Sequence, residues 1–387
     1  MGITLSMDIA FVTSYDSRDV RSWSGVPVHM SAGFESLGHS LDRVGPLKGT
    51  AAGPSLVKAQ LYRWAGRRYL RDRDPTLLHS YARQVKRRLD AGRSDIVVSV
   101  GSLPVAYLET DKPLAIWGDV CFAAMAEYYP EFSNLPARTM REGNRAEQSA
   151  LSRCRLAIFS TEWAARAAIA HYDVDPAKVR VIPLGANITE SPAPAAVERM
   201  VAARSRERCI MLFLAADWSR KGGDFAFEVT EALNASGVPT ELQVCGQEPP
   251  AAVLASPHVR YLGYVSKGTA ERRAQWANML TEAHFLILPT RRETFGSATC
   301  EVNAYGIPSL INDVGGTSGV VTNEINGLLF DPDAPATVWR DGIARLWSDP
   351  DWYAKLAMTS QQEFATRLNW PTGCRTLVEM LTGATPT

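Results

Sequence analysis

Two glutamates on either side of an expected helix start are the residues best suited to do chemistry. Glu293 lies in a polar loop after the apolar run 285–288, and Glu301 follows Gly296-Ser297 by about one helical turn. We expect Ser297 to cap the helix, so that the N–H groups of its first turn point at the loop and attract phosphate. Helical side chains lean toward the N-terminus, so Glu301 is expected to reach a ligand held there. Carboxylates repel phosphate and instead suit hydroxyls, as on a sugar or a ribose.

A second loop carries two positive charges beside two glycines. Arg220 and Lys221 precede Gly222-Gly223, after the apolar run 209–215. An isolated Arg-Lys pair is more often a solvated loop. Here, several loops are expected at one sheet edge, and this favours a diphosphate site whose negative charge grows as the diphosphate leaves.

A third loop offers a flat ring. Gly263-Tyr264-Val265 follows the expected strand 259–263 and could set backbone groups and the Tyr264 ring against a nucleobase. Together, the three loops have the ingredients of a site for a nucleotide-diphospho-sugar.

The elements that must position these loops alternate between strands and helices. This alternation predicts an α/β fold with two doubly wound domains. A chain of 387 residues also exceeds the usual size of one hydrophobic core. The segment Ser191-Pro-Ala-Pro-Ala-Ala interrupts the periodicity and is interpreted as a linker. We expect an N-terminal domain at 1–190, a C-terminal domain at 205–362 and a final helical segment at 363–387.

The first half also presents polar groups at expected strand ends. Gly25 lies in a loop between a first strand at 9–13 and a helix at 29–38, where it is either a ligand contact or a simple turn. Asp119 follows the strand 113–117. Strand ends of this kind line the ligand crevice of an open α/β sheet. Asp119 is therefore a candidate catalytic or acceptor-binding group, with helix capping as an equal alternative.

Several of these segments together resemble the retaining glycosyltransferases of family 4, which have the GT-B fold. The resemblance rests on Glu293 and Glu301 with seven residues between them and Phe295-Gly296 inside that interval. It rests also on further marks along nearly the whole chain: Trp23-Ser-Gly25, Val181-Ile-Pro-Leu-Gly185, Lys221-Gly222, Gly315-Gly316 and Asn326-Gly-Leu-Leu329. The Glu pattern alone would occur often by chance; its place after an apolar strand makes it specific.

The resemblance implies two Rossmann-like domains facing across a cleft, with the donor in the C-terminal domain. Glu301 would bind the donor ribose, Glu293 the transferred sugar, and Lys221 the leaving diphosphate. Gly25 would lie against that diphosphate, and the last helix would cross back to the N-terminal domain. The expected catalytic residues are Asp119, Lys221 and Glu293. The expected donor-binding residues are Gly25, Arg220, Lys221, Gly263, Tyr264, Val265, Glu293, Thr294, Phe295, Gly296, Ser297 and Glu301.

Two positions depart from the family pattern. Relatives usually carry an Arg several residues before the Lys, and that position here is near Ala216, so Arg220 is a displaced candidate for the same role. Many relatives also have a His after the strand at 114–117, where this chain has Gly118-Asp119.

The expected activity is transfer of a hexose from a nucleotide-diphospho-sugar to an acceptor hydroxyl, with retention and without an obligatory metal or other cofactor. One alternative is a nucleotide-sugar epimerase or hydrolase of the same fold. Another is a donor-binding regulatory subunit without catalysis. The sequence leaves open the nucleotide, the sugar and the acceptor, which could be a glycan, a lipid-linked sugar or a small molecule.

Composition narrows the compartment and the partners. The formal net charge is zero, which gives no nucleic-acid signature, and six cysteines without metal-ligand spacing indicate a reduced, cytoplasmic protein. Residues 58–93 are strongly basic. They are interpreted either as a basic face for anionic lipid or a phosphorylated acceptor, with a peripheral membrane contact, or as a solvated helix pair, and we favour the helix pair. Asp72-Arg73-Asp74 in this segment matches a metal-binding DxD pattern, but it lies at an expected helix end and is interpreted as a chance match.

Overall fold

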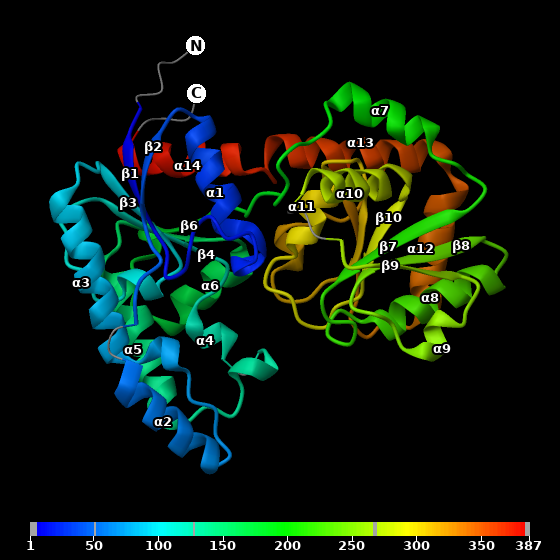
Figure 1. Ribbon diagram of the computed structural model, residues 1–387. Coiled ribbons are helices and arrows are strands. Elements are labelled where there is room, and N and C mark those ends of the chain that lie inside the picture. The colour runs from blue at the N-terminus through cyan, green and yellow to red at the C-terminus, as the bar shows by residue number, and fades with distance from the viewer. Residues whose placement is uncertain (1–5, 50–51, 127, 266–268, 384–387) are drawn as a thin grey trace. The chain divides into compact units, whose positions relative to one another are not determined.

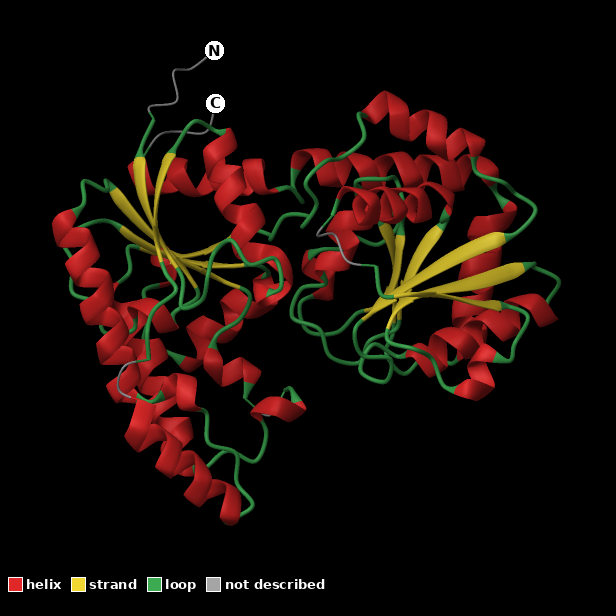
Figure 2. Cartoon of the chain, viewed as in Figure 1, coloured by secondary structure: helices red, strands yellow, loops and turns green. Residues whose placement is uncertain are grey.

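The computed structural model describes residues 6–49, 52–126, 128–265 and 269–383. The chain divides into two units: unit 1 comprises Met1–Leu184 with Trp370–Thr387, and unit 2 comprises Gly185–Asn369. Each unit is a twisted sheet with helices on its two faces (Figures 1 and 2). The units end at Leu184 and Asn369, near the expected domain ends at 190 and 362.

The sheet of unit 1 contains, within the described residues, six parallel strands in the order β2-β1-β3-β4-β5-β6. Strands β3 and β4 are buried along their whole length, because helices cover both faces of a parallel sheet. The strands are β1 (Asp8–Val12), β2 (Ser40–Val44), β3 (Ile96–Val100), β4 (Leu114–Gly118), β5 (Leu156–Phe159) and β6 (Val179–Val181). The helices are α1 (Val26–Ser36), α2 (Ala52–Trp64), α3 (Pro75–Ala91), α4 (Phe122–Met125), α5 (Ala137–Arg153), α6 (Glu162–His171) and α14 (Trp370–Thr382).

The sheet of unit 2 has, in the part of the chain that is described, six parallel strands in the order β12-β11-β10-β7-β8-β9. The strands are β7 (Cys209–Ala215), β8 (Thr240–Gly246), β9 (Val259–Gly263), β10 (Phe285–Leu288), β11 (Ser309–Asn312) and β12 (Gly327–Phe330). The helices are α7 (Pro194–Ala203), α8 (Gly223–Ala235), α9 (Ala251–Leu254), α10 (Ala270–Glu282), α11 (Ser297–Asn303), α12 (Ala336–Ser348) and α13 (Pro350–Thr366).

The order of the strands marks where a ligand crevice forms in each sheet. The chain builds unit 2 outward from β7 through β8 to β9, then returns to the other side of β7 with β10. In an open α/β sheet the connections on either side of such a reversal leave toward opposite faces, and this opens a crevice at the carboxyl ends of the two strands. In unit 1 the same reversal lies between β1 and β3.

The last helix belongs to unit 1. Helix α14 packs against α1, where a Cβ added at Gly33 would lie 2.9 Å from Cβ of Trp370. Trp370 also meets Trp117 of β4 edge to face, with ring centroids 5.5 Å apart. These apolar contacts secure the C-terminal segment to the sheet of unit 1.

Some local expectations are corrected. The expected linker at 191–196 is in part helical, because Pro194 begins α7. The DxD match has a structural role: the Asp74 side chain caps α3 by accepting from the Thr76 N–H, and Arg73 is buried with its guanidinium over the Phe122 ring. Pro75 begins α3, a position where proline's missing N–H costs nothing.

Candidate functional site

Lys221 and Glu293 meet at the carboxyl ends of β7 and β10, the two strands of the reversal in unit 2. The loop with Lys221 follows β7, the loop with Glu293 follows β10, and these strands are direct neighbours. The Lys221 ammonium forms an ion pair with the Glu293 carboxylate. The two side chains are only 15% and 12% exposed, so each charge depends on the other to offset lost hydration. The sequence predicted both as site residues, with Lys221 at the diphosphate and Glu293 at the transferred sugar, but it did not predict their contact.

Gly222 explains why the two loops come so close. Its φ of +79° lies in the left-handed region, and an added Cβ would lie 2.3 Å from the Pro289 carbonyl oxygen. The Thr290 hydroxyl donates a hydrogen bond to the Arg220 carbonyl oxygen over 3.2 Å. The loop after β7 is therefore attached directly to the end of β10, and this contact sets the position of Lys221.

Arg220 lies in the same loop but is directed differently. Its backbone N–H donates to the Asp217 carboxylate over 2.9 Å, and its guanidinium lies 3.9 Å from the same carboxylate. About a third of its side chain is exposed. Lys221 is thus the cation that reaches Glu293, whereas Arg220 pairs within its own turn.

Trp218, which was not predicted from the sequence, packs against this turn. Its indole N–H donates to Asp224 over 2.8 Å, and its ring covers Gly223, where an added Cβ would lie 2.2 Å from the ring. The ring is buried against Phe213 of β7. An aromatic residue four positions before two glycines was the signal in the sequence for this role.

The expected cap of α11 is wrong. Gly296 occupies the N-cap position with φ +99°, and Ser297 is the first residue of the helix. The left-handed conformation at the cap suits glycine, which explains why a serine is not found there. Thr294 and Phe295, which precede the cap, are buried, and so is Glu301 inside the helix, with 7% of its surface exposed.

Neighbouring elements hold α11 and its loop in place. The Gly316 N–H donates to the Glu293 carbonyl oxygen over 3.0 Å. The Asn326 amide donates to Asn303 of α11 over 2.8 Å and to the Val320 carbonyl oxygen over 2.9 Å. Gly316 and Asn326 belong to the segments that carried the family resemblance. Their contacts show that these segments support the loop of Glu293.

The third predicted loop lies farther along the same edge. Gly263 ends β9 with φ +72°, Tyr264 is 71% exposed and Val265 is buried. Strand β9 is separated from β7 by β8, so this loop is roughly 10 Å along the edge from the Lys221 loop. The structure does not bring Tyr264 against the ion pair; it leaves a span between them.

Two predicted residues, Gly25 and Asp119, belong to unit 1. Gly25 is the N-cap of α1 with φ +85°, and it follows Trp23 and Ser24, which have φ +44° and +54°. Non-glycine residues seldom adopt such values, so this turn stores backbone strain of the kind found at functional sites.

Asp119 directly follows β4, as predicted, but it does not cap a helix, because Cys121 is the N-cap of α4. Burial raises the pKa of Tyr15, and the nearby Asp119 carboxylate raises it further. The Tyr15 phenol therefore stays protonated and can donate a hydrogen bond at the carboxyl edge of the sheet. Tyr15 was not predicted from the sequence, where its only signal is its place shortly after β1.

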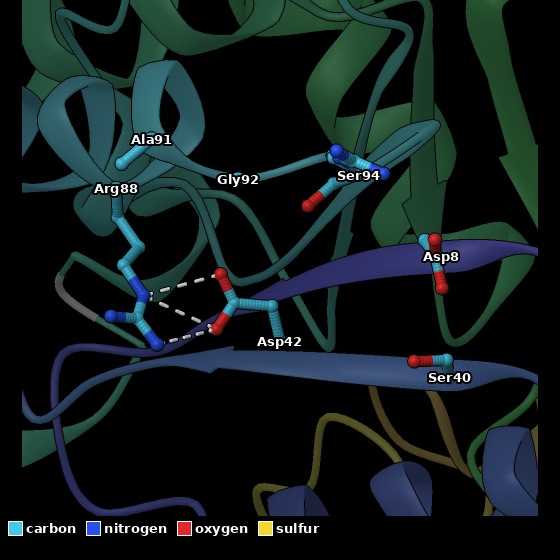
Figure 3. A pocket seen from close by; sticks show the side chains of 8 residues that line it. Asp8, Ser40, Asp42, Arg88, Ala91, Gly92 and Ser94 are labelled. Carbon is cyan, nitrogen blue, oxygen red and sulfur yellow. Dashed lines mark hydrogen bonds and ion pairs between the residues drawn. The ribbon is translucent and has the colours of Figure 1, made fainter.

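A separate pocket of about 390 Å³ lies at the opposite edge of unit 1, where strands begin. Figure 3 shows Arg88 of α3 paired with Asp42 of β2 across this pocket, and Asp8 and Ser40 also line it. It contains none of the predicted site residues. Among the described residues, no cluster of three or more His, Cys, Asp or Glu could hold a metal ion, and no helix is long and apolar enough to cross a membrane.

Comparison with solved structures supports the fold. The chain is similar to a glycosyltransferase from Rickettsia africae (TM-score 0.65, 16% identity, 98% of each chain covered). It is also similar to sucrose-phosphate synthase from Thermosynechococcus elongatus (TM-score 0.67, 16% identity), over 98% of this chain and 100% of that one. The Anabaena protein HepE, solved with UDP and glucose, matches with a TM-score of 0.62 and 13% identity over 97% of this chain and 100% of its own. Two doubly wound sheets are the shared GT-B architecture.

Two curated relatives are D-inositol 3-phosphate glycosyltransferases. The one from Gordonia bronchialis is 24% identical over 58% of this chain and 51% of its own. The one from Xylanimonas cellulosilytica is 26% identical over 59% of this chain and 57% of its own. The chain thus matches only about half the length of these relatives.

Family models match both halves of the chain. The model for Glycosyltransferase Family 4 matches residues 26–190, and the model for Glycosyl transferases group 1 matches residues 208–349. The first match includes the strand end at Asp119, and the second includes Lys221, Glu293 and Glu301. The chain belongs to the group 1 glycosyltransferases of family 4.

Proposed function

We propose that this protein is a retaining hexosyltransferase that moves a sugar from a nucleotide-diphospho-sugar to an acceptor hydroxyl. The observation that carries the proposal is the Lys221–Glu293 ion pair at the strand reversal of unit 2. A cation and a carboxylate side by side match a donor in which an anionic diphosphate adjoins a sugar rich in hydroxyls. Glu301, buried one helical turn farther along, is the proposed partner of the donor ribose.

The proposed reaction replaces one bond at the anomeric carbon by another on the same face. The acceptor oxygen bonds to that carbon, the bond from the carbon to the diphosphate oxygen breaks, and the departing diphosphate takes the acceptor proton. Lys221 would exchange part of its contact with Glu293 for a diphosphate oxygen, and so stabilise charge that appears only as the bond breaks. Glu293 would then accept from sugar hydroxyls.

Tyr264 and its neighbours are the proposed base-binding end of the site. The span of roughly 10 Å between the loops after β7 and β9 is comparable to the extent of a nucleoside diphosphate between its phosphates and its base. Tyr264 is exposed, as a stacking residue must be before its ligand binds. In unit 1, Gly25 is proposed as a diphosphate contact, and Asp119 with Tyr15 as acceptor-binding groups.

The names of similar proteins suggest the first compounds to try. HepE was solved with UDP and glucose, so UDP-glucose is a first donor, beside GDP- and ADP-sugars. The curated relatives act on D-inositol 3-phosphate, which is therefore a first acceptor. No cofactor is proposed, and the reaction is proposed to proceed without a metal ion.

The test is a mass analysis of products with and without acceptor. The proposal expects an acceptor heavier by one hexose residue, with retained anomeric configuration, and an equal amount of nucleoside diphosphate. Lys221→Ala should remain folded, though less stable than wild type because Glu293 loses its partner, and lower turnover by roughly a hundred-fold or more. Full transfer by this variant would refute the diphosphate role of Lys221. Free sugar or an epimerised donor with unchanged acceptors would instead identify the hydrolase or epimerase.

A further inference from the structure

Helix α2 of unit 1 has large apolar side chains on its outer surface. Leu56, Val57, Leu61 and Trp64 are 50%, 61%, 55% and 75% exposed. At 100° per residue the four project within an arc of about 140°, so they form one stripe along the helix. A surface helix of a soluble domain normally turns such a stripe toward the core. Four large apolar side chains gathered on one exposed face form a patch of the kind that marks an interaction site.

The inner side of α2 is held by polar and aromatic contacts. The Lys58 ammonium lies 2.7 Å from the Asp74 carboxylate, which also accepts from the Tyr69 hydroxyl over 2.7 Å. The Tyr62 and Tyr69 rings stack, with centroids 5.5 Å apart. Because Asp74 also caps α3, these contacts fix the rotation of α2 about its axis. The apolar stripe is directed outward by specific contacts on the opposite side of the helix.

Positive charge accompanies the stripe, mainly from four arginines, since Lys58 is paired with Asp74. The segment 52–71 contains Lys58, Arg63, Arg67, Arg68 and Arg71 and no Asp or Glu. The four arginines are exposed. The whole chain has a formal net charge of zero, so this positive charge is a local property of the segment. Figure 1 shows α2 at the end of unit 1, beyond α3 and α5.

We propose that α2 and the basic segment after it, residues 52–71, form a docking surface for a membrane containing anionic lipids. Leu61 and Trp64 would enter the boundary between headgroups and acyl chains, where Trp is favoured, and the arginines would pair with anionic headgroups. Apolar residues flanked by basic ones along one helix suit this surface. If the surface instead bound an acidic protein or a second copy of this chain, the protein would not bind vesicles.

The rest of the basic segment does not share these properties. On α3, Lys86 pairs with Asp90 and Arg88 pairs with Asp42, so two of its charges are already offset. Among the described residues, no large apolar side chain of α3 is strongly exposed. The structure therefore narrows the membrane interpretation of residues 58–93 to α2 and its following turn. The inference stands independently of the proposed reaction.

The test is co-sedimentation of the purified full chain with vesicles. We expect binding to mixed phosphatidylcholine–phosphatidylglycerol vesicles, weakening as salt is added, and little binding to pure phosphatidylcholine. Leu61→Ser with Trp64→Ser should lower the partition coefficient roughly ten-fold or more. Arg63→Gln with Arg71→Gln should lower it roughly thirty-fold, and this second pair leaves the apolar stripe intact.

Matched controls come from the same chain. Val338→Ser removes a comparably exposed apolar residue of α12, and Arg83→Gln with Arg87→Gln removes two exposed charges of α3. Both should bind vesicles nearly as wild type does, and all variants should keep the wild-type far-UV circular dichroism. The proposal is overturned if wild type ignores anionic vesicles or binds neutral ones equally. It is also overturned if the α3 pair reduces binding as much as the α2 pairs.

Discussion

Lys221 and Glu293 contact each other in the structure, and this contact alters the role expected for each of them. The sequence assigned Lys221 to a diphosphate and Glu293 to a sugar, as if the two acted alone. In the structure they form an ion pair that is mostly removed from water. The pair keeps both charges compensated in the absence of a donor, and the proposed reaction exchanges one of its contacts for a phosphate oxygen.

A double-mutant cycle measures this coupling. Lys221→Met should destabilise the fold because it leaves the Glu293 carboxylate buried without its cation, and Glu293→Gln should do the converse. The double variant should lose less than the sum of the two, with a coupling free energy of about 1–3 kcal/mol in urea unfolding. Additive losses would mean that the ion pair contributes nothing to stability.

His284, which precedes β10, predicts a pH dependence of stability. Burial, together with the smaller effect of the nearby Arg204, lowers its pKa from 6.5 to about 3. Its Nδ1 accepts a hydrogen bond from the Ile210 N–H over 3.0 Å, which requires the neutral ring. Between pH 6.5 and 3 the unfolded chain binds a proton that the folded chain does not bind. Stability from this residue is therefore complete above pH 6.5 and is lost as the pH falls.

The comparison of wild type with His284→Asn isolates this effect, since the asparagine oxygen keeps an acceptor for the Ile210 N–H. The free energy of unfolding of wild type should fall more steeply between pH 6 and 4, by up to about 1.4 kcal/mol per pH unit relative to the variant. Parallel profiles for the two proteins would show that His284 does not carry the pH dependence.

At the scale of elements, the close approach of the loops after β7 and β10 depends on Gly222. Gly222→Ala should cost about 1–2 kcal/mol for a side chain at positive φ, and about 1–3 kcal/mol more for the clash with Pro289. Gly237→Ala provides the control, because Gly237 has φ +88° and nothing within 4 Å of an added Cβ. The melting temperature and the turnover should both fall more for Gly222→Ala than for Gly237→Ala. Equal losses at the two positions would contradict the role given to the contact with Pro289.

The elements best predicted from the sequence were those with strong local signals. Strands β7, β9 and β10 have the expected bounds, because short apolar runs end at glycine, proline or polar loops. Strand β2 was missed because its sequence, Ser40-Leu-Asp-Arg-Val44, is largely polar, as an edge strand permits.

The parts of the site that escaped prediction depend on strand order or on backbone conformation. The sequences around residues 221 and 293 do not indicate that β7 and β10 are neighbours. The sequence therefore predicted only that the two residues lie at one sheet edge, and not that they form an ion pair. Serine is a favoured N-cap residue, so Ser297 was expected to cap α11. The backbone of Gly296 is left-handed instead, and the N-cap lies one residue earlier. The outward stripe of α2 follows from tertiary contacts of Lys58 and Tyr62 that periodicity cannot reveal.

At the scale of the whole molecule, the account assigns charge stabilisation to Lys221 and to backbone N–H groups. Transfer measured with purified protein should therefore be unchanged, within about two-fold, after treatment with EDTA and after addition of Mg²⁺ or Mn²⁺. Loss of turnover with EDTA, restored by one of these ions, would contradict the metal-independent reaction.

The central claim is that the loops after β7, β9 and β10 form a nucleotide-sugar site in unit 2. Calorimetric titration of UDP, GDP and ADP into wild type and Glu301→Ala tests it most directly, with folding of the variant checked by circular dichroism. We expect one nucleotide to bind wild type and to bind the variant roughly ten-fold or more weakly, because a buried contact with a ribose hydroxyl is lost. Binding of none of the three nucleotides, or equal binding by both proteins, would contradict it.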